Sequence, residues 1–325
     1  MRYRPLGRTG FEVSEIGHGL WGMGSWSGSD DRQALEALRA SVDIGINFFD
    51  SAWDYGKGRS DRLLGQLLRE FPDKKLIAAS KVPPKNMKWP ATSDDRLRDA
   101  FPRAHVLEYV ETIRRDLGVD RIDVLQFHVW DDSWTTDNEW RDTVAELEQR
   151  GKIRAFGVSL NGGEPWNGIK VIGTGFIDTV QAVFNLFEQE PEDELLPACR
   201  AAKVGVIARV PLDEGSLGGK MTSETTFPPD DWRHYYFNPD NLRETLRRVE
   251  VLRRDLPDGM SLPEAALRFV LSYPEVSTTI VGMRKAEYVE QNARAVAAGP
   301  LSPELLGRLR KHRWDRTRDR RSAGS

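Results

Sequence analysis

The chain has 325 residues, of which 39% are hydrophobic and 30% are charged, a composition typical of an ordinary globular protein. The formal net charge is −3 with both signs interspersed, so the overall charge does not favour nucleic-acid binding. No stretch approaches the roughly 20 apolar residues of a membrane-spanning helix, and the N-terminal sequence MRYRPLGR lacks the apolar core of a signal peptide. We therefore expect a cytoplasmic protein with neither a membrane nor a nucleic-acid partner.

The single cysteine, Cys199, excludes an intrachain disulfide and a cysteine-based metal cage. It lies in the sequence LPACRAA, which is typical of a helix. We expect Cys199 to be a small buried hydrophobic residue, the alternative being a nucleophile. No flavin or metal motif is visible in the chain.

Short apolar runs alternate with helical patterns along nearly the whole chain. The predicted strands are residues 15–20, 47–50, 76–81, 123–128, 155–159, 178–181, 205–209 and 277–281. Most lack the polar alternation of a one-sided sheet, as buried parallel strands do. The predicted helices are residues 30–43, 60–70, 104–117, 138–150, 165–173, 191–202, 240–254 with 263–272, and 285–297. Asp30 is a plausible N-cap of the first helix, and Gly118 stands where another should stop.

Eight strand–helix units in one continuous chain predict an α/β fold of the (β/α)8 TIM-barrel type. An open doubly wound sheet is the alternative, but no GxGxxG turn follows the first strand. Before the first barrel strand, residues 3–13 are predicted to form a hairpin that turns around residues 8–10. We expect a single domain over residues 1–313.

Three connections after strands are longer than usual, at residues 82–102, 129–136 and 210–239. On a barrel they would stand at the catalytic face, where long loops are commonly functional.

The C-terminal residues 308–321 carry many cations. They are either an arm for nucleic acid or anionic membrane, or a solvated helix end that frays, which we favour because chain termini are commonly disordered. We expect residues 314–325 to be a basic tail whose removal leaves activity unchanged.

Four polar residues lie at or just beyond the C-terminal ends of predicted strands: Asp50, Tyr55, Lys81 and His128. Strand ends of a parallel barrel open onto one face, so we expect these residues to converge. An ammonium group lowers the pKa of a neighbouring tyrosine, a carboxylate balances the lysine, and a neutral histidine can orient the substrate oxygen. The set predicts a proton-transfer site, with Tyr55 as general acid and base.

Each of the four also has an ordinary structural explanation. Asp50 suits a cap, Tyr55 a half-buried loop aromatic, and Lys81 a surface charge. His128 suits a hydrogen-bonded core residue. These explanations must all hold at once, in the right order on the right strands, for the site to be absent.

The four residues, together with the segments NFFDSAWDYG (residues 47–56) and RSDRLLG (residues 59–65), resemble the aldo-keto reductase superfamily. Within that superfamily the chain resembles bacterial-type NADP-dependent oxidoreductases, and the resemblance runs from Arg4 to about Arg310. It implies that the N-terminal hairpin caps the bottom of the barrel and that an extra helix follows near the C-terminus.

The resemblance also implies a nicotinamide cofactor extended across the barrel mouth. Ser159 ends the fifth predicted strand, where relatives hold the carboxamide with a Ser-Asn pair; here Leu160 intervenes and Asn161 follows. Gln181 resembles the glutamine that contacts the same amide. Arg209 stands where many relatives place an aromatic ring, and a guanidinium plane can also stack on the nicotinamide. The residues that resemble the loop along the pyrophosphate are Leu212, Gly215, Ser216, Leu217 and Lys220.

The last such segment passes from a strand through Gly282 into a helix that begins near Lys285. Helix N-termini attract phosphate, and Arg284 adds positive charge beside Lys285. The resemblance places the adenosine 2′-phosphate at this corner, with Gln291 and Asn292 near the adenine. Two adjacent cations favour NADPH over NADH; the alternative is two solvated charges in a helix's first turn.

Three tryptophans follow strand ends and are candidate substrate residues: Trp21, Trp53 and Trp130. Three more lie on the long loops, where they would either close over substrate or pack their own loops: Trp89, Trp134 and Trp232. Aromatic pockets suit flat or apolar carbonyl compounds. Tryptophan also packs against sugars, and Asp131 and Asp132 could bind hydroxyl groups, so the substrate stays open.

We expect NADPH-dependent reduction of an aldehyde or ketone to an alcohol, with a small-molecule carbonyl substrate. Two alternatives remain, an NAD-linked sugar or polyol oxidoreductase and a regulatory subunit that binds cofactor with little turnover. The resemblance leaves a homo-oligomer open, because relatives occur both as monomers and as larger assemblies.

Overall fold

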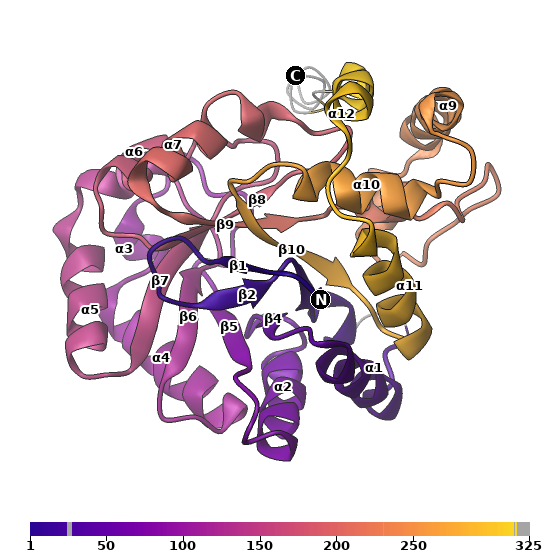
Figure 1. The fold of residues 1–325 in the computed structure, drawn as a ribbon. Helices are drawn as coiled ribbons and strands as arrows, with labels where there is room; N and C mark the ends of the chain where they lie inside the picture. The colour runs from indigo at the N-terminus through magenta and orange to yellow at the C-terminus, as the bar shows by residue number, and fades with distance from the viewer. Residues whose placement is uncertain (25–27, 230, 315, 317–325) are drawn as a thin grey trace.

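The computed structural model describes residues 1–24, 28–229, 231–314 and 316, and its centre is a closed barrel (Figure 1). The strands are β3 (Ile16–Gly19), β4 (Phe48–Asp50), β5 (Ile77–Val82), β6 (Ile122–Phe127), β7 (Ile153–Ser159), β8 (Thr179–Val183), β9 (Gly205–Arg209) and β10 (Val276–Gly282). Each pairs in parallel with its neighbour, and β10 pairs with β3 to close the ring. The predicted (β/α)8 barrel is therefore confirmed, and the open sheet is excluded.

The main helices surround the strands (Figure 1) and follow the predicted order. They are α1 (Asp31–Ile44), α2 (Arg59–Glu70), α4 (Arg103–Leu117), α5 (Asn138–Gln149), α6 (Ile169–Gly173), α7 (Leu195–Ala202), α9 (Pro239–Asp255), α10 (Leu262–Leu271) and α11 (Ala286–Ala297). Asp30 caps α1 by accepting a hydrogen bond from the backbone of Gln33, and Gly118 ends α4 at φ 68°. Two helices are shorter than predicted: α6 begins only after Gly168, and a 3-10 turn, η3 (Glu190–Glu192), precedes α7.

Short elements interrupt the loops at the C-terminal ends of the strands. They are η1 (Trp21–Met23), α3 (Leu97–Ala100), η2 (Asp132–Thr136), η4 (Asp213–Gly218) and α8 (Arg233–Tyr236). The predicted extra helix is present as α12 (Pro303–Leu309), followed by η5 (Arg310–His312). Trp314 and Arg316 are the described residues of the predicted basic tail; the remainder of that tail lies outside the described residues.

Two hydrophobic layers hold the barrel together. Inside it, hairpin residues such as Leu6 and Phe11 pack with inward-facing strand residues such as Phe48 and Ile280. Outside it, a larger layer of aliphatic and aromatic side chains joins the strands to the helices. Each barrel strand is therefore buried on both faces, which explains its continuous apolar run.

The hairpin, β1 (Tyr3–Pro5) and β2 (Glu12–Ser14), closes the lower end of the barrel, the end opposite the C-terminal ends of the strands; in Figure 1 it crosses the ring of strands. Gly7, at φ 54°, lies so close to β9 that a Cβ there would be 2.2 Å from the Gly205 nitrogen. No larger residue fits at Gly7 without a shift of the backbone.

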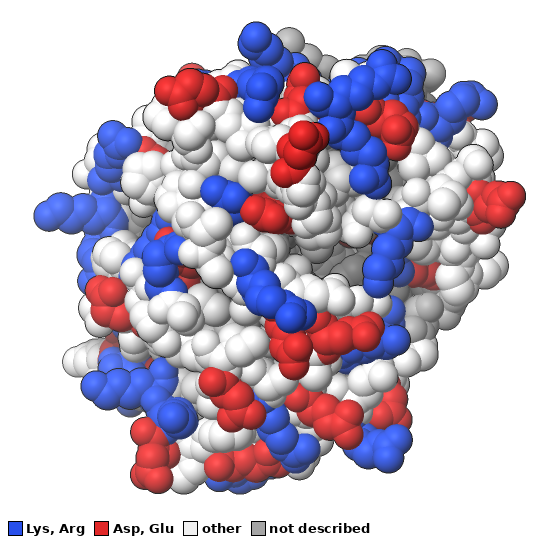
Figure 2. Space-filling model, turned by 45° about the vertical axis from the view of Figure 1, so that its right-hand side comes forward, with Lys and Arg blue, Asp and Glu red and all other residues white. Residues whose placement is uncertain are grey.

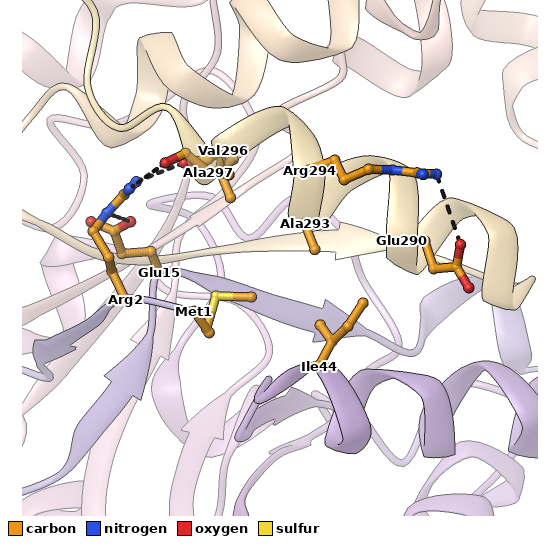
Figure 3. A pocket seen from close by; sticks show the side chains of 9 residues that line it. All are labelled: Met1, Arg2, Glu15, Ile44, Glu290, Ala293, Arg294, Val296 and Ala297. Atoms are coloured by element: carbon orange, nitrogen blue, oxygen red, sulfur yellow. Dashed lines mark hydrogen bonds and ion pairs between the residues drawn. The ribbon is translucent and has the colours of Figure 1, made fainter.

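Two arginines tie the hairpin to the end of the chain. The Arg2 guanidinium pairs with Glu15 at 2.7 Å and donates to the carbonyl of Val296 at 2.8 Å, at the end of α11. Figure 3 shows this contact beside a small cavity of about 460 Å³. Arg4 donates to the carbonyl of Leu271 at 2.6 Å. These bonds join the first residues to the last strand–helix unit.

Positive and negative side chains are interspersed over the face seen in Figure 2. This agrees with the small net charge of −3. None of the helices in the described ranges is long and apolar enough to span a membrane.

His18, on β3, is a fully buried histidine outside the catalytic set. Its Nδ1 is 2.8 Å from Ser41 Oγ on α1, and its ring stacks near Phe49. Burial lowers the pKa of His18 to about 3. The native protein therefore holds this imidazole neutral.

Acid should destabilise the protein because of this residue. Between pH 6.5 and about 3 the unfolded chain binds a proton that native His18 does not. As the pH falls through this range, the free energy of unfolding should therefore decrease by about 1.4 kcal/mol per pH unit because of this group. The variant His18→Asn keeps a hydrogen-bond partner for Ser41 but removes this proton. In it, the slope of the free energy of unfolding against pH, measured by denaturant unfolding across this range, should be smaller than in the wild type by the equivalent of about one proton. An unchanged slope would contradict this account.

Candidate active site

A cleft of about 1650 Å³ opens where the C-terminal ends of the barrel strands meet. The loop after every barrel strand contributes to its wall. In strand order, these loops supply Trp21, Tyr55, Trp89, His128, Asn161, Glu188, Gly215 and Arg284. The three long loops predicted from the sequence all contribute lining residues, and this cleft is the candidate active site.

The four predicted catalytic residues meet at the base of this cleft. Lys81 has no exposed surface, and its Nζ lies 2.6 Å from Asp50 Oδ2 and 2.7 Å from the carbonyl oxygen of Ser51. The same Nζ is 3.5 Å from the Tyr55 hydroxyl. The rings of Tyr55 and His128 lie edge to face, with centroids 5.6 Å apart. Tyr55 and His128 line the cleft, and Lys81 lies behind them.

Two buried glutamines also donate hydrogen bonds to Asp50. Its Oδ1 accepts hydrogen bonds from Gln181 Nε2 at 2.9 Å and from Gln126 Nε2 at 3.3 Å. Asp50, Lys81, Gln126 and Gln181 come from β4, β5, β6 and β8, so side chains of four strands form one buried polar layer. Buried charges are tolerated when they are paired and hydrogen-bonded, as here.

A second buried carboxyl group supports the loop that carries Tyr55. Asp61, in the first turn of α2, accepts a hydrogen bond from Ser80 Oγ at 2.9 Å. The hydroxyl groups of Ser51 and Ser60 are 2.6 Å apart in the same cluster. Burial raises the pKa of Asp61 to about 7. These contacts fix both ends of the loop around Tyr55.

The environment of Tyr55 differs from the sequence-based expectation. Lys81 does act to lower the pKa of Tyr55, but burial raises it more strongly, and the net shift is upward. The walls of the cleft remove the phenol from water, which disfavours the phenolate. Tyr55 therefore holds its proton at neutral pH, in the form a proton donor needs.

His128 and Lys81 have opposite protonation states. Burial, followed by the charges of Lys81 and Arg209, lowers the pKa of His128 well below its ordinary value, so this imidazole is neutral. Its Nδ1 is buried without a hydrogen-bond partner in the described structure. Burial also acts to lower the pKa of Lys81, but Asp50 and Tyr55 outweigh it and the net pKa is raised. The site thus combines a fixed cation, a neutral imidazole and a protonated phenol.

Two of the candidate residues for the nicotinamide end, Asn161 and Arg209, bond backbone carbonyl groups of neighbouring loops. Ser159 ends β7 and lines the cleft, 3% exposed. The Asn161 amide donates to the Ala91 carbonyl at 2.8 Å and so ties down the loop after β5. Arg209 donates to the carbonyl of Leu160 at 3.0 Å, and its Nε is buried without a partner in the described structure.

The loop after β9 has a strained backbone. Val210, Asp213 and Glu214 have φ values of 59°, 48° and 53°, the left-handed region that residues with a Cβ rarely adopt. Each such residue costs about 1–3 kcal/mol unless its surroundings compensate. The predicted residues Leu212, Gly215 and Lys220 of this loop line the cleft, whereas Ser216 and Leu217 lie buried beneath it.

The opposite wall of the cleft is formed by β10 and α11. The predicted residues that line it are Gly282, Arg284, Gln291 and Asn292. The methylenes of Arg284 pack over Gly22, where a Cβ would lie 3.1 Å from Arg284 Cδ. Lys285 is exposed at the N-cap of α11 and does not line the cleft. Lys220 reaches across from the other wall, its Nζ 3.3 Å from the Tyr288 hydroxyl.

The candidate substrate tryptophans occupy three different settings. Trp21, 37% exposed, lines the cleft. Trp53 is half-buried against Tyr109, with ring centroids 4.8 Å apart, and does not line it. Trp130 has no exposed surface, and its Nε1 donates to Asp132 at 2.9 Å. The structure thus brings Trp21 to the cleft, and it places Trp53 and Trp130 in packing positions behind the wall.

Among the loop tryptophans, Trp89 and Trp232 line the cleft and are about two-fifths exposed, at 41% and 39%. The Trp89 ring lies edge to face with His128, at 5.8 Å between centroids. Trp134 is buried, with its Nε1 bonded to the carbonyl of Asp95 at 2.7 Å.

Sequence reasoning missed several charged residues of the cleft. They are Asp54, Glu164, Glu188, Glu214, Arg233, Arg253, Glu264 and Arg294. Asp54 lies beside Tyr55 in the most distinctive sequence segment, so its place in the sequence could have predicted that it lines the cleft. Glu164 and Glu188 sit in the loops after β7 and β8, where no pattern distinguishes a lining residue from a solvated one.

Comparisons with known proteins agree with this geometry. The model of the aldo/keto reductase family matches residues 15–313. Aldo-keto reductase YhdN of Bacillus subtilis (strain 168) is 33% identical over 297 residues, covering 89% of this chain and 87% of the relative. The NADH-specific methylglyoxal reductase of Escherichia coli (strain K12) is 27% identical, covering 91% and 94%.

A solved structure shows the same arrangement. The glycerol dehydrogenase AKR11B4 from Gluconobacter oxydans superposes with a TM-score of 0.79 at 30% identity, covering 95% of this chain and 94% of that one. The family match extends over the whole barrel and includes the segments that carry the four converging residues. The chain belongs to the aldo/keto reductase family.

Proposed function

We propose that this protein reduces an aldehyde or ketone to an alcohol with NADPH, and catalyses the reverse reaction when given alcohol and oxidised cofactor. The observation that carries the proposal is the buried Lys81, which joins Asp50 at 2.6 Å and the Tyr55 hydroxyl at 3.5 Å at the base of the cleft. A phenol whose proton is held, next to a fixed cation and a neutral imidazole, suits protonation of a forming alkoxide.

The residues of the cleft fit a nicotinamide dinucleotide. The buried Nε of Arg209 and the buried Nδ1 of His128 lack partners in the described structure, so both atoms can still form hydrogen bonds to a bound molecule at the base of the cleft. Ser159 and Gln181 would face the carboxamide, and the loop from Leu212 to Lys220 would take the pyrophosphate. When bound, the reduced cofactor supplies a hydride to the carbonyl carbon.

The protein's own residues would handle the proton and the developing charge. Tyr55 donates its hydroxyl proton to the carbonyl oxygen as negative charge develops there. Lys81 stabilises the phenolate that remains, and Asp50 holds Lys81 in place. His128, neutral in this site, orients the substrate oxygen toward Tyr55.

The choice of NADPH rests on Arg284, which lines the cleft just before α11, and on the positive charge of Lys285 beside it, outside the cleft. Arg284→Ala should raise the Kd for NADPH by about 10- to 100-fold, the value of a hydrogen bond to a charged group, and leave the Kd for NADH unchanged. The measurement is the quenching of tryptophan fluorescence during titration with each cofactor. Trp21 and Trp232 at the cleft provide the signal.

Arg243→Ala is the matched control, because Arg243 is an exposed arginine of α9 that pairs with Asp240. It should bind both cofactors as the wild type does. Failure of the wild type to bind either cofactor would refute hydride transfer. Tight NADH binding with no effect of Arg284→Ala would instead refute the phosphate corner.

An NAD-linked polyol oxidoreductase is the second candidate. The glycerol dehydrogenase and the NADH-specific reductase among the relatives favour it, as do the carboxylates of Asp54 and Glu164 in the cleft wall, which suit hydroxyl groups. Steady-state oxidation of polyols with NAD, faster than reduction of apolar aldehydes with NADPH, would support this candidate over the first.

A further inference from the structure

The loop after β9 stands in a conformation that its own backbone does not favour. Val210, Asp213 and Glu214 all have positive φ, and Val210 is β-branched, the type of residue for which this region is rarest. Strained residues persist where surrounding contacts over-determine them. The loop lines the cleft, so whatever holds it also shapes the cleft.

Asp213 is the residue through which the loop is held. Its side chain is 1% exposed and does not line the cleft. One carboxylate oxygen accepts a hydrogen bond from Ser216 within the loop, and the other forms an ion pair with Arg316. Arg316 is 3% exposed, and it also bonds the hydroxyl group of Tyr236 on α8. The loop and α8 are thus tied to a residue near the C-terminus.

Arg316 is itself held by the part of the chain that precedes it. Two guanidinium groups lie over the ring of Trp314, that of Arg248 at 4.3 Å and that of Arg316 at 4.4 Å from its centroid. The Trp314 backbone donates to the carbonyl of Phe187 in the loop after β8, at 2.8 Å. Arg316 therefore stands in a fixed place between α9 and the loops after β8 and β9.

Charge gives this contact a second consequence. Three carboxylates gather at this wall: Asp213, Glu214 and Glu188, the last with its Oε1 3.7 Å from Arg316 Nε. Burial, followed by the nearby Asp213, raises the pKa of Glu214 to about 7. Without Arg316 an unpaired carboxylate would remain buried directly behind the wall.

We propose that Arg316 is a positioning residue of the cofactor site, which holds the loop of residues 210–219 in its binding conformation. The inference rests on the proposed function, because it takes this loop as the wall that meets the cofactor's phosphates. It assigns a role to a residue beyond Trp314, where the sequence alone predicted none.

The test compares three variants of the full chain. Arg316→Ala should raise the Kd for NADPH, measured by tryptophan fluorescence, about tenfold, because the loop would occupy its binding conformation only about a tenth of the time. Amide hydrogen exchange at Gly215 and Leu217 should be faster without cofactor. Arg316→Lys, which keeps the charge but loses the planar contact with Trp314, should show a smaller change in the same direction.

Arg313→Ala is the matched control. Arg313 lies three residues away and pairs with Asp193 at 2.5 Å, outside the cleft. It should leave both the Kd and the exchange at the loop unchanged. If Arg316→Ala fails to fold, Arg316→Lys provides the same two readouts.

Three results would overturn the inference, and they differ. A wild type that binds NADPH, with Arg316 variants that bind equally well and exchange equally slowly at the loop, would leave the proposed function intact and remove the positioning role. A wild type that binds neither NADPH nor NADH would remove both. A lowered melting temperature with unchanged Kd and loop exchange would make Arg316 a purely structural residue and so also count against the proposal.

Discussion

Tyr55→Phe should lower kcat for carbonyl reduction by about 10²- to 10⁴-fold, the usual contribution of a general acid. The substitution removes the hydroxyl group of Tyr55, which lies 3.5 Å from Lys81 Nζ, and leaves the ring to pack against His128. The Kd for NADPH should stay close to that of the wild type. Steady-state kinetics with a panel of aldehydes and fluorescence titration of the cofactor would provide both quantities.

The pH dependence offers an independent check on the same residue. Burial raises the pKa of Tyr55, so its proton is present through neutral pH. Reduction should therefore hold its rate there and decline only as the pH rises toward the pKa of the phenol. Oxidation of alcohol needs the phenolate and should accelerate over the same alkaline range. Tyr109→Phe, which removes a hydroxyl group from α4, is the control; equal losses in both variants would contradict the assignment.

Lys81→Met should be the most destabilising single substitution of the site. It leaves the Asp50 carboxylate buried at 1% exposure without its cation. Removing one partner of a buried ion pair costs about 3–5 kcal/mol in the free energy of unfolding. Denaturant unfolding followed by circular dichroism would measure the loss.

The double variant Asp50→Asn with Lys81→Met separates stability from catalysis. It removes both charges, so most of the lost stability should return, and the double variant should lose less stability than the two single variants added together. Turnover should stay low, because Tyr55 still lacks the ammonium group. A double variant as unstable as Lys81→Met alone would show that the loss came from packing rather than from the unpaired charge.

The barrel was predictable because its strands are buried on both faces and therefore appear as unbroken apolar runs. The convergence of Asp50, Lys81 and His128 followed from the same fact, since the ends of parallel strands share one face. The net shift of the Tyr55 pKa was not predictable. It depends on how closely the walls of the cleft surround the phenol, and loops from several distant segments build those walls.

Residues beyond strand ends show where sequence reasoning stops. Trp21 and Trp130 both follow strands closely, yet one lines the cleft and the other is enclosed by Trp134 and Trp140. The direction of a side chain in a loop depends on tertiary packing, which carries no local periodicity. Arg316 is a further case: its partner Asp213 lies about a hundred residues earlier, and a run of arginines looks the same whether it is solvated or buried.

The closure of the ring by β10 and β3 has a consequence for how this protein is made. The first barrel strand, at Ile16–Gly19, finds one of its two neighbours only when Val276–Gly282 has left the ribosome. Arg2 and Arg4 likewise bond carbonyl groups of residues 271–297, which are synthesised only near the end of the chain. During most of its synthesis the nascent chain therefore carries an open sheet edge, the kind of surface on which strands of other molecules can add. The nascent chain should therefore depend on chaperones until the last strand–helix unit is made, although that unit lies far from the proposed catalytic residues.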